Sequence, residues 1–490
     1  MAAITALVIA LVAVVNIILF AVVEAFGLYL YHTEEHDLSL SGMTDELFAE
    51  AISEGKTVKI SFCYPEDEVK LHSVGSFVYQ TAKYLDERHG DFIELDYINL
   101  VTKRNAAGEL VADKLAKYKK DMKGNDTAIY ESSVIFECDG NYRVVTDTYS
   151  TAGYADFYTL DSSGVMTSYN GEEVMAGMIS WVLSDTHKTA YFTQYHGEVV
   201  DLSFANLFAL AGYYVDVIDL RRSEVPEDAD LLVISNPTGD FQQGAVGTGV
   251  RSEIERIESY LEKGGDLMVF LDPYVKTLPV LESFLARQGI SFASTETENG
   301  KILRNIVKDY SDAITTDGFM IVANYADSPL GNAIKNTVSA HSDGNIIINQ
   351  VSALELSGDA KPVLISSSSS VAEAGGVTVD RNGSYCIAAY TEREVEGNKY
   401  SVMVMPSIYV AVSDSLVTRG YANKDYIFSI FDNLYGSDSM PYGCNAVLID
   451  TTTLENLTMG AAKLYTAALL AIPALIGVVG AVVIVRRKNK

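Results

Sequence analysis

Long apolar runs occupy both ends of the chain, and shorter alternating patterns fill the region between them. Residues 4–23 contain no charged side chain and are interrupted only by Asn16, and the apolar run resumes after Glu24. Residues 464–485 are likewise uncharged. Since about 20 apolar residues span a bilayer core, these runs predict a transmembrane anchor in 1–31 and a second transmembrane helix at 464–485. A cleaved signal peptide fits the first run less well, because the N-terminus lacks a basic region and the run is too long.

The charges beside these runs predict their orientation. The tail after the second run, residues 486–490, is basic, whereas the residues after the first run are acidic. Positively charged flanks of membrane spans stay in the cytoplasm. We therefore expect both termini to be cytoplasmic and residues 32–463 to lie on the outer face of a cell membrane.

Two polar side chains in the first run are candidate contacts for a partner within the membrane. An ionisable group such as Glu24 is costly at membrane depth and usually faces a protein partner or water. Asn16 is able to form a hydrogen bond with another helix. The alternative for Glu24 is a place at the outer interface, where the cost is small, and both interpretations stay open.

The first part of the outer region, residues 38–186, mixes helical and period-two spacing. The pattern predicts helices at 44–51, 75–89, 109–121 and 172–183 and strands at 57–62, 92–100, 133–137 and 142–146, with a hairpin turn at Asp139-Gly140. From the first strand onward, the order β-α-β-α-β-β-α is that of a thioredoxin-like domain. Cys63 follows the first strand without a second cysteine nearby, which argues against a thiol–disulfide enzyme.

The second part, residues 187–445, alternates strands and helices. It predicts strands at 189–193, 215–220, 231–235, 267–271, 346–351, 363–367, 385–390 and 400–405, and helices at 202–211, 252–262, 278–288 and 423–435. This alternation is typical of a mostly parallel, doubly wound sheet. The expected fold class is therefore α/β, with two membrane spans flanking a thioredoxin-like domain and a larger doubly wound domain.

Composition excludes several classes of protein. The chain has 36 Lys and Arg against 65 Asp and Glu, a net charge of −29, which argues against nucleic-acid binding because phosphate contacts need clustered Lys and Arg. A hydrophobic content of 48% argues against a mainly disordered chain. The four cysteines lie far apart with no C-x-x-C, so we expect neither a metal site nor a dithiol redox site.

Polar residues follow three of the predicted strands of the second part: His196, Glu198, Asn236 and Asp272. Ligands of open parallel sheets bind beyond the carboxyl ends of the strands. The imidazole, carboxylates and amide therefore predict a site for a polar ligand or a partner. The alternative is turn chemistry, since these residue types also shape and cap strand-to-helix loops.

No motif supplies catalysis or nucleotide binding. The sequence has no G-x-S-x-G elbow, and no cysteine falls on a predicted strand-to-helix turn of the second part. It has no G-x-x-x-x-G-K-[ST] loop, and the glycines of 244–249 have the wrong spacing for G-x-G-x-x-G. We therefore predict neither an enzyme nor a cofactor.

Six short segments, in order along the chain, carry a resemblance to a known family. They are Leu38-Ser-Leu-Ser-Gly-Met-Thr44, Tyr195-His-Gly-Glu198, Leu232-Val-Ile-Ser-Asn-Pro-Thr238, Tyr260-Leu-Glu-Lys-Gly-Gly-Asp-Leu267, Leu271-Asp-Pro273 and Asn423-Lys-Asp425. With two terminal spans around them, the chain resembles the GldG-like family of gliding-motility-associated ABC-transporter auxiliary proteins. It departs from the family pattern at Tyr195, where the family has Gly, and in a Gly-rich insertion at 239–249.

The resemblance implies a non-catalytic, membrane-anchored accessory subunit of a bacterial ABC transporter. Such a subunit couples an outer binding domain to a permease and an ATPase that are separate chains, in contact with membrane lipid and within a homo- or hetero-oligomer. The larger domain would look like a glutamine-amidotransferase or flavodoxin-like domain without its nucleophile.

Two other functions are weighed against this one. A membrane-tethered, hydrolase-like enzyme would gather perturbed titratable groups in one deep pocket. A surface adhesin would need only one anchor. An accessory subunit instead predicts polar residues on the spans that face partner helices.

Overall fold

A computed structural model describes residues 38–449, apart from 39, 106–107, 109, 147–154, 161–164, 245–250, 298, 312–313, 382, 419, 438–439 and 445. The described residues as far as Leu448 belong to one compact unit. Both predicted spans lie outside the described residues, together with Asn16, Glu24 and the basic tail. Among the residues that are described, no helix has the length and apolar character needed to cross a bilayer.

Four strands form the first sheet: β1 (Val58–Phe62), β2 (Ile93–Tyr97), β3 (Val134–Cys138) and β4 (Asn141–Val145). Their order is β2-β1-β3-β4, with β1 parallel to β2 and antiparallel to β3. The predicted hairpin turn is confirmed, because Asp139 and Gly140 both have positive φ angles, 49° and 96°, as a type I′ turn requires. The helices of this part are α2 (Met43–Leu47), α3 (Ala49–Ser53), α4 (Glu66–Val69), α5 (Gly75–Arg88), α6 (Val111–Lys114), the 3₁₀ turn η2 (Ala116–Lys119) and α7 (Gly171–Leu183).

The single helix predicted at 109–121 is wrong, because the segment consists of one α-helical turn, α6, and then η2. Tyr118 of η2 packs with Cys63, Ile98 and Ile135 in a small core, and its hydroxyl donates to Glu137 of β3. These contacts with the sheet require the tighter turn, so tertiary packing overrides helix propensity here.

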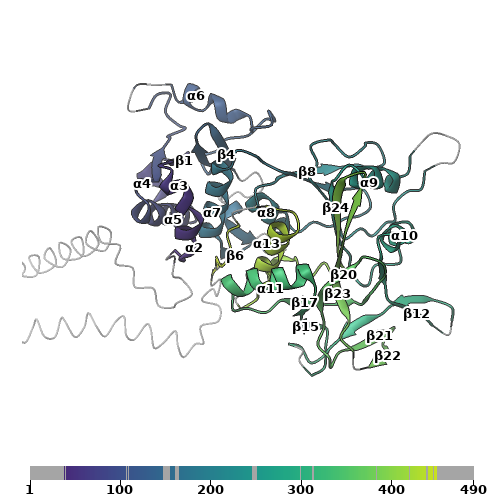
Figure 1. The fold of residues 1–490 in the computed structure, drawn as a ribbon. Coiled ribbons are helices and arrows are strands. Elements are labelled where there is room, and N and C mark those ends of the chain that lie inside the picture. Colours follow the sequence, from purple (N-terminus) through teal and green to yellow (C-terminus); the bar gives the residue numbers. More distant parts are fainter. Residues whose placement is uncertain are drawn as a thin grey trace, which may run out of the picture. The chain divides into compact units, whose positions relative to one another are not determined.

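The largest sheet has ten strands (Figure 1). Its parallel part is β8 (Tyr214–Ile218), β7 (Thr189–Thr193), β9 (Leu231–Ser235), β10 (Asp266–Phe270) and β24 (Asn398–Met405), in that order. Antiparallel strands continue beyond β24: β23 (Cys386–Val395), β19 (Leu354–Leu356), β11 (Ile290–Phe292), β20 (Lys361–Ile365) and β16 (Asn324–Tyr325).

Helices cover both faces of the parallel strands. On one face, α8 (Leu202–Leu210) places Phe204 and Phe208 against Phe192 of β7, and Phe208 also contacts Phe431 of α13 (Asn423–Asn433). On the other face, α9 (Glu253–Leu261) and α10 (Pro279–Arg287) share a buried core with alternate residues of β9, β10 and β24. The predicted mixed α/β fold is therefore confirmed.

Elements between α10 and β23 were largely missed by the sequence pattern. The strand predicted at 346–351 is divided at Gln350, whose φ of 51° turns the chain between two short strands. These strands join different small sheets, because β17 pairs with β15 and β18 pairs with β14. The two halves of the divided strand are β17 (Ile347–Asn349) and β18 (Val351–Ser352). The elements not predicted are α4, β11, β16 and β19, together with α11 (Pro329–His341), α12 (Ser413–Val417), η3 (Ala155–Phe157), β5 (Tyr158–Leu160), β6 (Met166–Tyr169), β12 (Ser294–Glu296), β13 (Ile302–Arg304), β14 (Ile306–Lys308), β15 (Met320–Val322), β21 (Val371–Ala374), β22 (Val377–Arg381) and β25 (Val447–Leu448).

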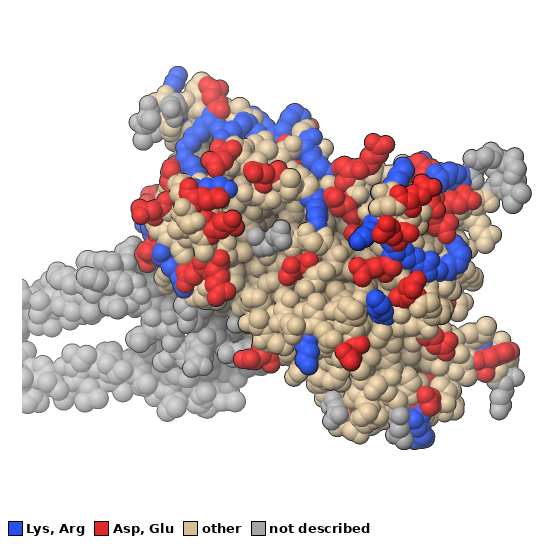
Figure 2. Space-filling view, in the orientation of Figure 1, with Lys and Arg blue, Asp and Glu red and all other residues tan. Residues whose placement is uncertain are grey.

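Surface charges of both signs are interspersed over the face shown in Figure 2. The lysine-rich stretch 114–123 illustrates how positive charge is offset locally. Lys114 pairs with Asp96 at 2.6 Å, and Lys123 pairs with Asp228 at 2.6 Å. Such paired lysines are not the clustered cations that phosphate binding requires.

Candidate functional site

Buried charged side chains gather at two places in the described residues. The first is a cavity beside α7. The second lies beyond the carboxyl ends of β7 and β9, where the sequence predicts a polar site.

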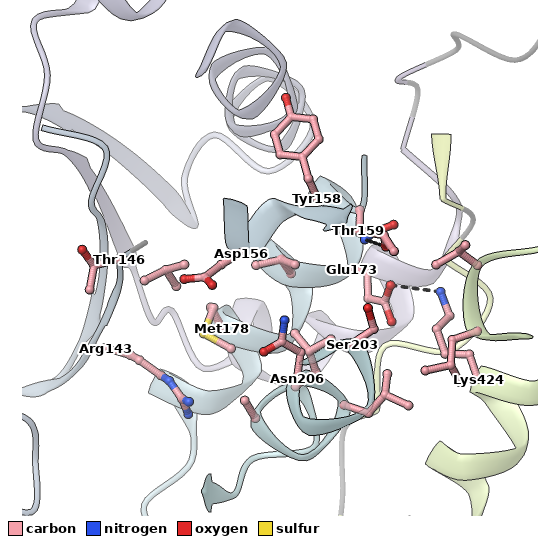
Figure 3. Close-up of a pocket in the computed structure, with 18 of the residues that line it drawn as sticks. Arg143, Thr146, Asp156, Tyr158, Thr159, Glu173, Met178, Ser203, Asn206 and Lys424 are labelled. Atoms are coloured by element: carbon pink, nitrogen blue, oxygen red, sulfur yellow. Dashed lines mark hydrogen bonds and ion pairs between the residues drawn. The ribbon is translucent and has the colours of Figure 1, made fainter. Parts of the chain in front are cut away.

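The cavity beside α7 has a volume of about 180 Å³ and is lined by residues of β4, α7, α8, α12 and α13 (Figure 3). Glu173 of α7 and Lys424 of α13 form an ion pair on its wall, with 3.0 Å between Oε2 and Nζ. Their side chains are only 7% and 11% exposed. Sequence reasoning missed both residues, because an acidic residue in a first helical turn is already explained by the helix dipole.

The second place is the topological switch point of the parallel sheet. In the strand order β8-β7-β9-β10-β24, the chain first passes from β7 to β8 on one side of β7. It then returns to β9 on the other side of β7 and continues outward through β10 to β24. Ligands of such sheets bind where this reversal opens a crevice. His196 follows β7 and Asn236 follows β9, so the sequence placed its candidate residues correctly relative to the sheet.

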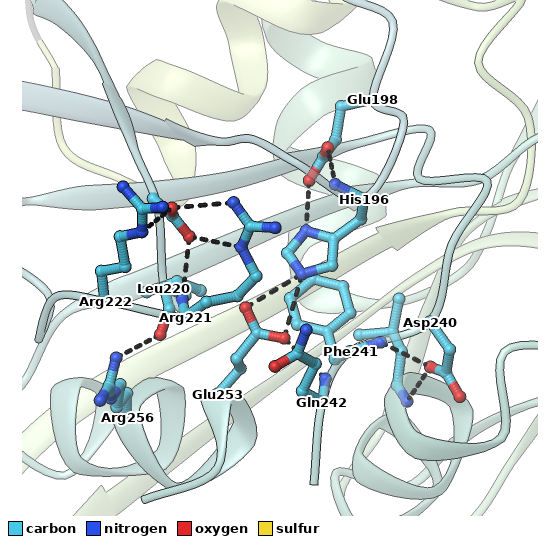
Figure 4. A network of polar contacts seen from close by, with 12 residues as sticks. His196, Glu198, Leu220, Arg221, Arg222, Asp240, Phe241, Gln242, Glu253 and Arg256 are labelled. Carbon is cyan, nitrogen blue, oxygen red and sulfur yellow. Dashed lines mark hydrogen bonds and ion pairs between the residues drawn. The ribbon is translucent and has the colours of Figure 1, made fainter. Parts of the chain in front are cut away.

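His196 lies between two carboxylates at this point (Figure 4). Its Nδ1 is 2.7 Å from Oε1 of Glu198, and its Nε2 is 3.0 and 3.1 Å from the two carboxylate oxygens of Glu253. The ring also stacks on Phe241, with 4.1 Å between ring centroids. The three polar side chains are 2–4% exposed, so this network is closed to solvent.

The two carboxylates determine the charge of the imidazole. Burial would lower the pKa of His196, but the hydrogen bonds with Glu198 and Glu253 outweigh burial and raise it to about 9. For Glu198, burial raises the pKa, and the hydrogen bond from His196 more than offsets this, so the pKa is lowered overall. An imidazolium whose two N–H groups are both donated to carboxylates has no nitrogen left to accept a proton from a ligand.

Backbone contacts hold the loop around His196 in a narrow turn. The carbonyl oxygen of His196 accepts hydrogen bonds from the backbone N–H groups of Thr238 and Gly239, at 2.9 and 2.6 Å. A Cβ on Gly197, whose φ is 76°, would lie 2.1 Å from Oγ1 of Thr238, so only glycine fits there. Tyr195 has a φ of 80°, a conformation in which glycine is the usual residue. The tyrosine adopts this conformation at some cost.

The other two predicted residues form a separate pair. The side-chain oxygen of Asn236 accepts a hydrogen bond from the backbone N–H of Asp272 at 2.9 Å, which ties the end of β9 to the end of β10. The carboxylate of Asp272 accepts from the backbone N–H of Tyr274 at 2.7 Å and from the hydroxyl of Tyr409 at 3.3 Å. These are the bonds expected of turn chemistry, which was the alternative interpretation.

Glu253 is the residue of this network that sequence reasoning missed. It lies in the first turn of α9, directly after the N-cap Ser252, which forms a capping box with Glu255. The position is 57 residues from His196, and acidic residues are common there for local reasons. No signal in the sequence separates a capping glutamate from one that binds a distant histidine.

None of the four cysteines has the environment of a nucleophile. Burial raises the pKa of Cys63 and of Cys386 to about 12 and that of Cys138 to about 11. Burial also raises the pKa of Cys444 well above its usual range. Since the thiolate is the reactive form, these raised pKa values disfavour nucleophilic reactivity at neutral pH.

Comparisons with known proteins give only distant likenesses. No family model and no curated protein matches the chain. Among solved structures, it is similar to the N-terminal domain of mmIFT52 (15% identity, TM-score 0.37, covering 51% of this chain and 99% of that one). It is also similar to PurLQS from Thermotoga maritima (15%, 0.29, 51% and 100%) and to a glutamine amidotransferase from the same organism (12%, 0.24, 53% and 89%). With TM-scores below 0.5, these likenesses assign no function to the chain.

Proposed function

We propose that this chain is a non-catalytic, membrane-anchored accessory subunit of an ABC transporter. Its outer α/β region would be coupled to a permease and an ATPase supplied by other chains. The observation that carries its non-catalytic part is the closed network of His196, Glu198 and Glu253 at the switch point of the sheet.

A catalytic switch point would need a nucleophile or a base that a substrate can reach. Here both ring nitrogens of His196 are occupied by carboxylates, and all three side chains are buried. Glu198 and Glu253 in turn accept backbone hydrogen bonds, from His196 and Gln242, each at 2.6 Å. With unreactive cysteines as well, these groups support a rigid body that holds or contacts a partner.

Topology supports the finer fold assignments that belong to this proposal. The order β2-β1-β3-β4 with parallel β1 and β2 suits a thioredoxin-like domain in 38–186. The order β8-β7-β9-β10-β24 is the flavodoxin-like order, which suits a glutamine-amidotransferase-like domain without its nucleophile in 187–445. The apolar runs at 1–31 and 464–485 supply the anchors.

Co-purification of the full chain in mild detergent tests the proposal. Wild-type protein should bring down a permease and an ATPase, and Glu24→Leu should weaken this association because the glutamate is the costliest group of the first span. Glu34→Leu, the same change just beyond the span, is the matched control and should behave like wild type.

Two results would replace this proposal with the membrane-tethered enzyme. One is a chain that purifies alone and is indifferent to Glu24→Leu. The other is covalent labelling of a single residue by an activity-based hydrolase probe, together with loss of function.

A further inference from the structure

The cavity beside α7 has an unsatisfied acceptor on its wall. Glu173 is 6% exposed, and its Oε2 pairs with Lys424. The Lys424 ammonium also donates to the carbonyl oxygen of Cys444 at 2.5 Å. The other carboxylate oxygen, Oε1, is buried and has no hydrogen-bond partner among the described residues. Buried acceptors are nearly always paired in native proteins, so this oxygen calls for a donor from another molecule.

A residue with an unsatisfied donor lines the same cavity at β4. The Nη1 of Arg143 is buried, and within the described residues it has no acceptor. Its guanidinium lies over the ring of Trp181, 5.1 Å from the ring centroid. Burial lowers the pKa of Arg143 to about 10, and the opposing effects of Tyr214, Asp156 and Asp121 offset burial only in part. A guanidinium group is best satisfied by a carboxylate, which accepts hydrogen bonds in its plane.

Mostly apolar side chains, with the amide of Asn206 among them, separate these two polar groups. Figure 3 shows Met178 and Asn206 between Arg143 on one side and Glu173 on the other. Val174 and Leu207 also line the cavity. A cavity of about 150 Å³ holds benzene, which has six non-hydrogen atoms, so this one, at about 180 Å³, suits a molecule of about seven to eight.

We propose that this cavity binds a short zwitterion, with its ammonium group toward Oε1 of Glu173, its carboxylate toward Arg143 and a few methylene groups between them. The proposal deepens the proposed function and rests on it in one respect, namely that the ligand is held and not transformed. The proposal thereby specifies a short zwitterion as the class of ligand that the outer region holds.

Binding to the purified full chain in mild detergent tests the proposal with three probes of one length: 5-aminopentanoate, pentanoate and pentylamine. Isothermal calorimetry should show 5-aminopentanoate binding about tenfold or more tightly than either probe that lacks one charge, since each probe leaves one buried group unsatisfied. Equal binding of all three, or no binding, would overturn the proposal.

Two variants test the assignment of the ends. Arg143→Gln should weaken 5-aminopentanoate binding about tenfold and leave pentylamine binding unchanged. The double variant Glu173→Met/Lys424→Met, which leaves no buried charge of this pair without a partner, should weaken 5-aminopentanoate binding similarly and leave pentanoate binding unchanged. Retained binding of the one-charge probe shows that the cavity is still folded. Arg222→Gln, at a side chain that is 82% exposed, is the matched control and should change nothing.

The same preparations separate this inference from the proposed function. If Arg143→Gln loses the zwitterion but still co-purifies with the permease, the ligand site and the docking function are both supported as distinct features. If the zwitterion binds but no permease or ATPase co-purifies, the proposed function fails and the ligand site stands. If 5-aminopentanoate responds identically to Arg143→Gln and Arg222→Gln, the ligand site fails alone.

Discussion

A single imidazole joins two segments that are distant in the chain. Through Glu198 and Glu253, His196 ties the loop after β7 to the first turn of α9, and its carbonyl oxygen binds the loop after β9. A buried ion network of this kind is costly to break, because removal of one member leaves the others charged and unpaired. The residue is therefore a structural cross-link at the switch point.

Stability should depend on pH through His196. Because the pKa of His196 in the folded chain, about 9, lies above its usual 6.5, the stabilisation is complete below about 6.5 and is lost as the pH rises through about 9. The lowered pKa of Glu198 acts in the opposite direction: its contribution is present above its usual 4.5 and is lost as the pH falls. Wild-type protein should thus unfold at progressively lower temperature between pH 6.5 and 9.

The variant His196→Gln should lose about 3 kcal/mol at pH 6.5, because two carboxylates then lack their cation, and its melting temperature should change less between pH 6.5 and 9. Thermal unfolding in detergent at several pH values measures both effects. His341→Gln is a matched control that should keep the wild-type slope. A wild-type melting temperature that is flat over this range would contradict the assignment.

At the scale of elements, α7 connects the two α/β parts. It contacts β3 and β4 of the first sheet and α8 of the second part. Glu173 near its start pairs with Lys424 of α13, 251 residues away in the sequence. The pKa of Lys424 is lowered by burial, but the charge of Glu173 more than compensates and raises it, so the lysine stays charged. The pair thus fixes how α7 and α13 meet.

Removing one member of this pair should cost far more than removing both. Lys424→Met leaves the Glu173 carboxylate buried without a counter-ion and should destabilise the fold by about 3–5 kcal/mol. The double variant Glu173→Met/Lys424→Met should recover most of that loss, since an apolar pair carries no buried charge. Chemical denaturation of the detergent-purified chain measures these free energies of unfolding.

Lys70→Met offers a control at an exposed pair. Lys70 and Glu66 form an i,i+4 ion pair at 3.1 Å with side chains about 45% exposed. Its loss should cost less than about 0.5 kcal/mol. Equal effects of Lys70→Met and Lys424→Met would show that the buried pair has no special role.

At the scale of the whole molecule, the proposed role depends on where the α/β region lies relative to the membrane. The described residues form a mixed α/β body. Only residues outside the described part, 1–31 and 464–485, carry the apolar runs expected of membrane spans. The basic tail 486–490 gives the expected orientation.

This topology predicts a clear result from limited proteolysis. Protease added to intact cells or protoplasts should degrade residues 32–463 and spare tags placed at either end. Both tags should be cleaved once the cells are lysed, which is the control for protease activity. Protection of the central region in intact cells would contradict the predicted topology.

Local patterns were enough to predict most regular elements of the parallel sheet and of the first sheet. The alternation in β1, the turn at Asp139-Gly140 and the helix predicted at 252–262 depend on residues within a few positions of one another, so the sequence alone determines them. It also identified His196 and Glu198 as neighbours at a strand end, because they lie two residues apart.

Tertiary structure alone decided which distant groups meet. The packing of helices on sheets brings Glu253 to His196 and Lys424 to Glu173. It also places Arg143 in the cavity that Glu173 lines. Local sequence spacing cannot predict these contacts. The same holds for the division of a predicted strand at Gln350, where pairing with two different sheets overrides a continuous apolar pattern. Local propensity contributes little free energy compared with the burial of surfaces between distant segments. Where the two favour different secondary structures, burial therefore determines which one forms.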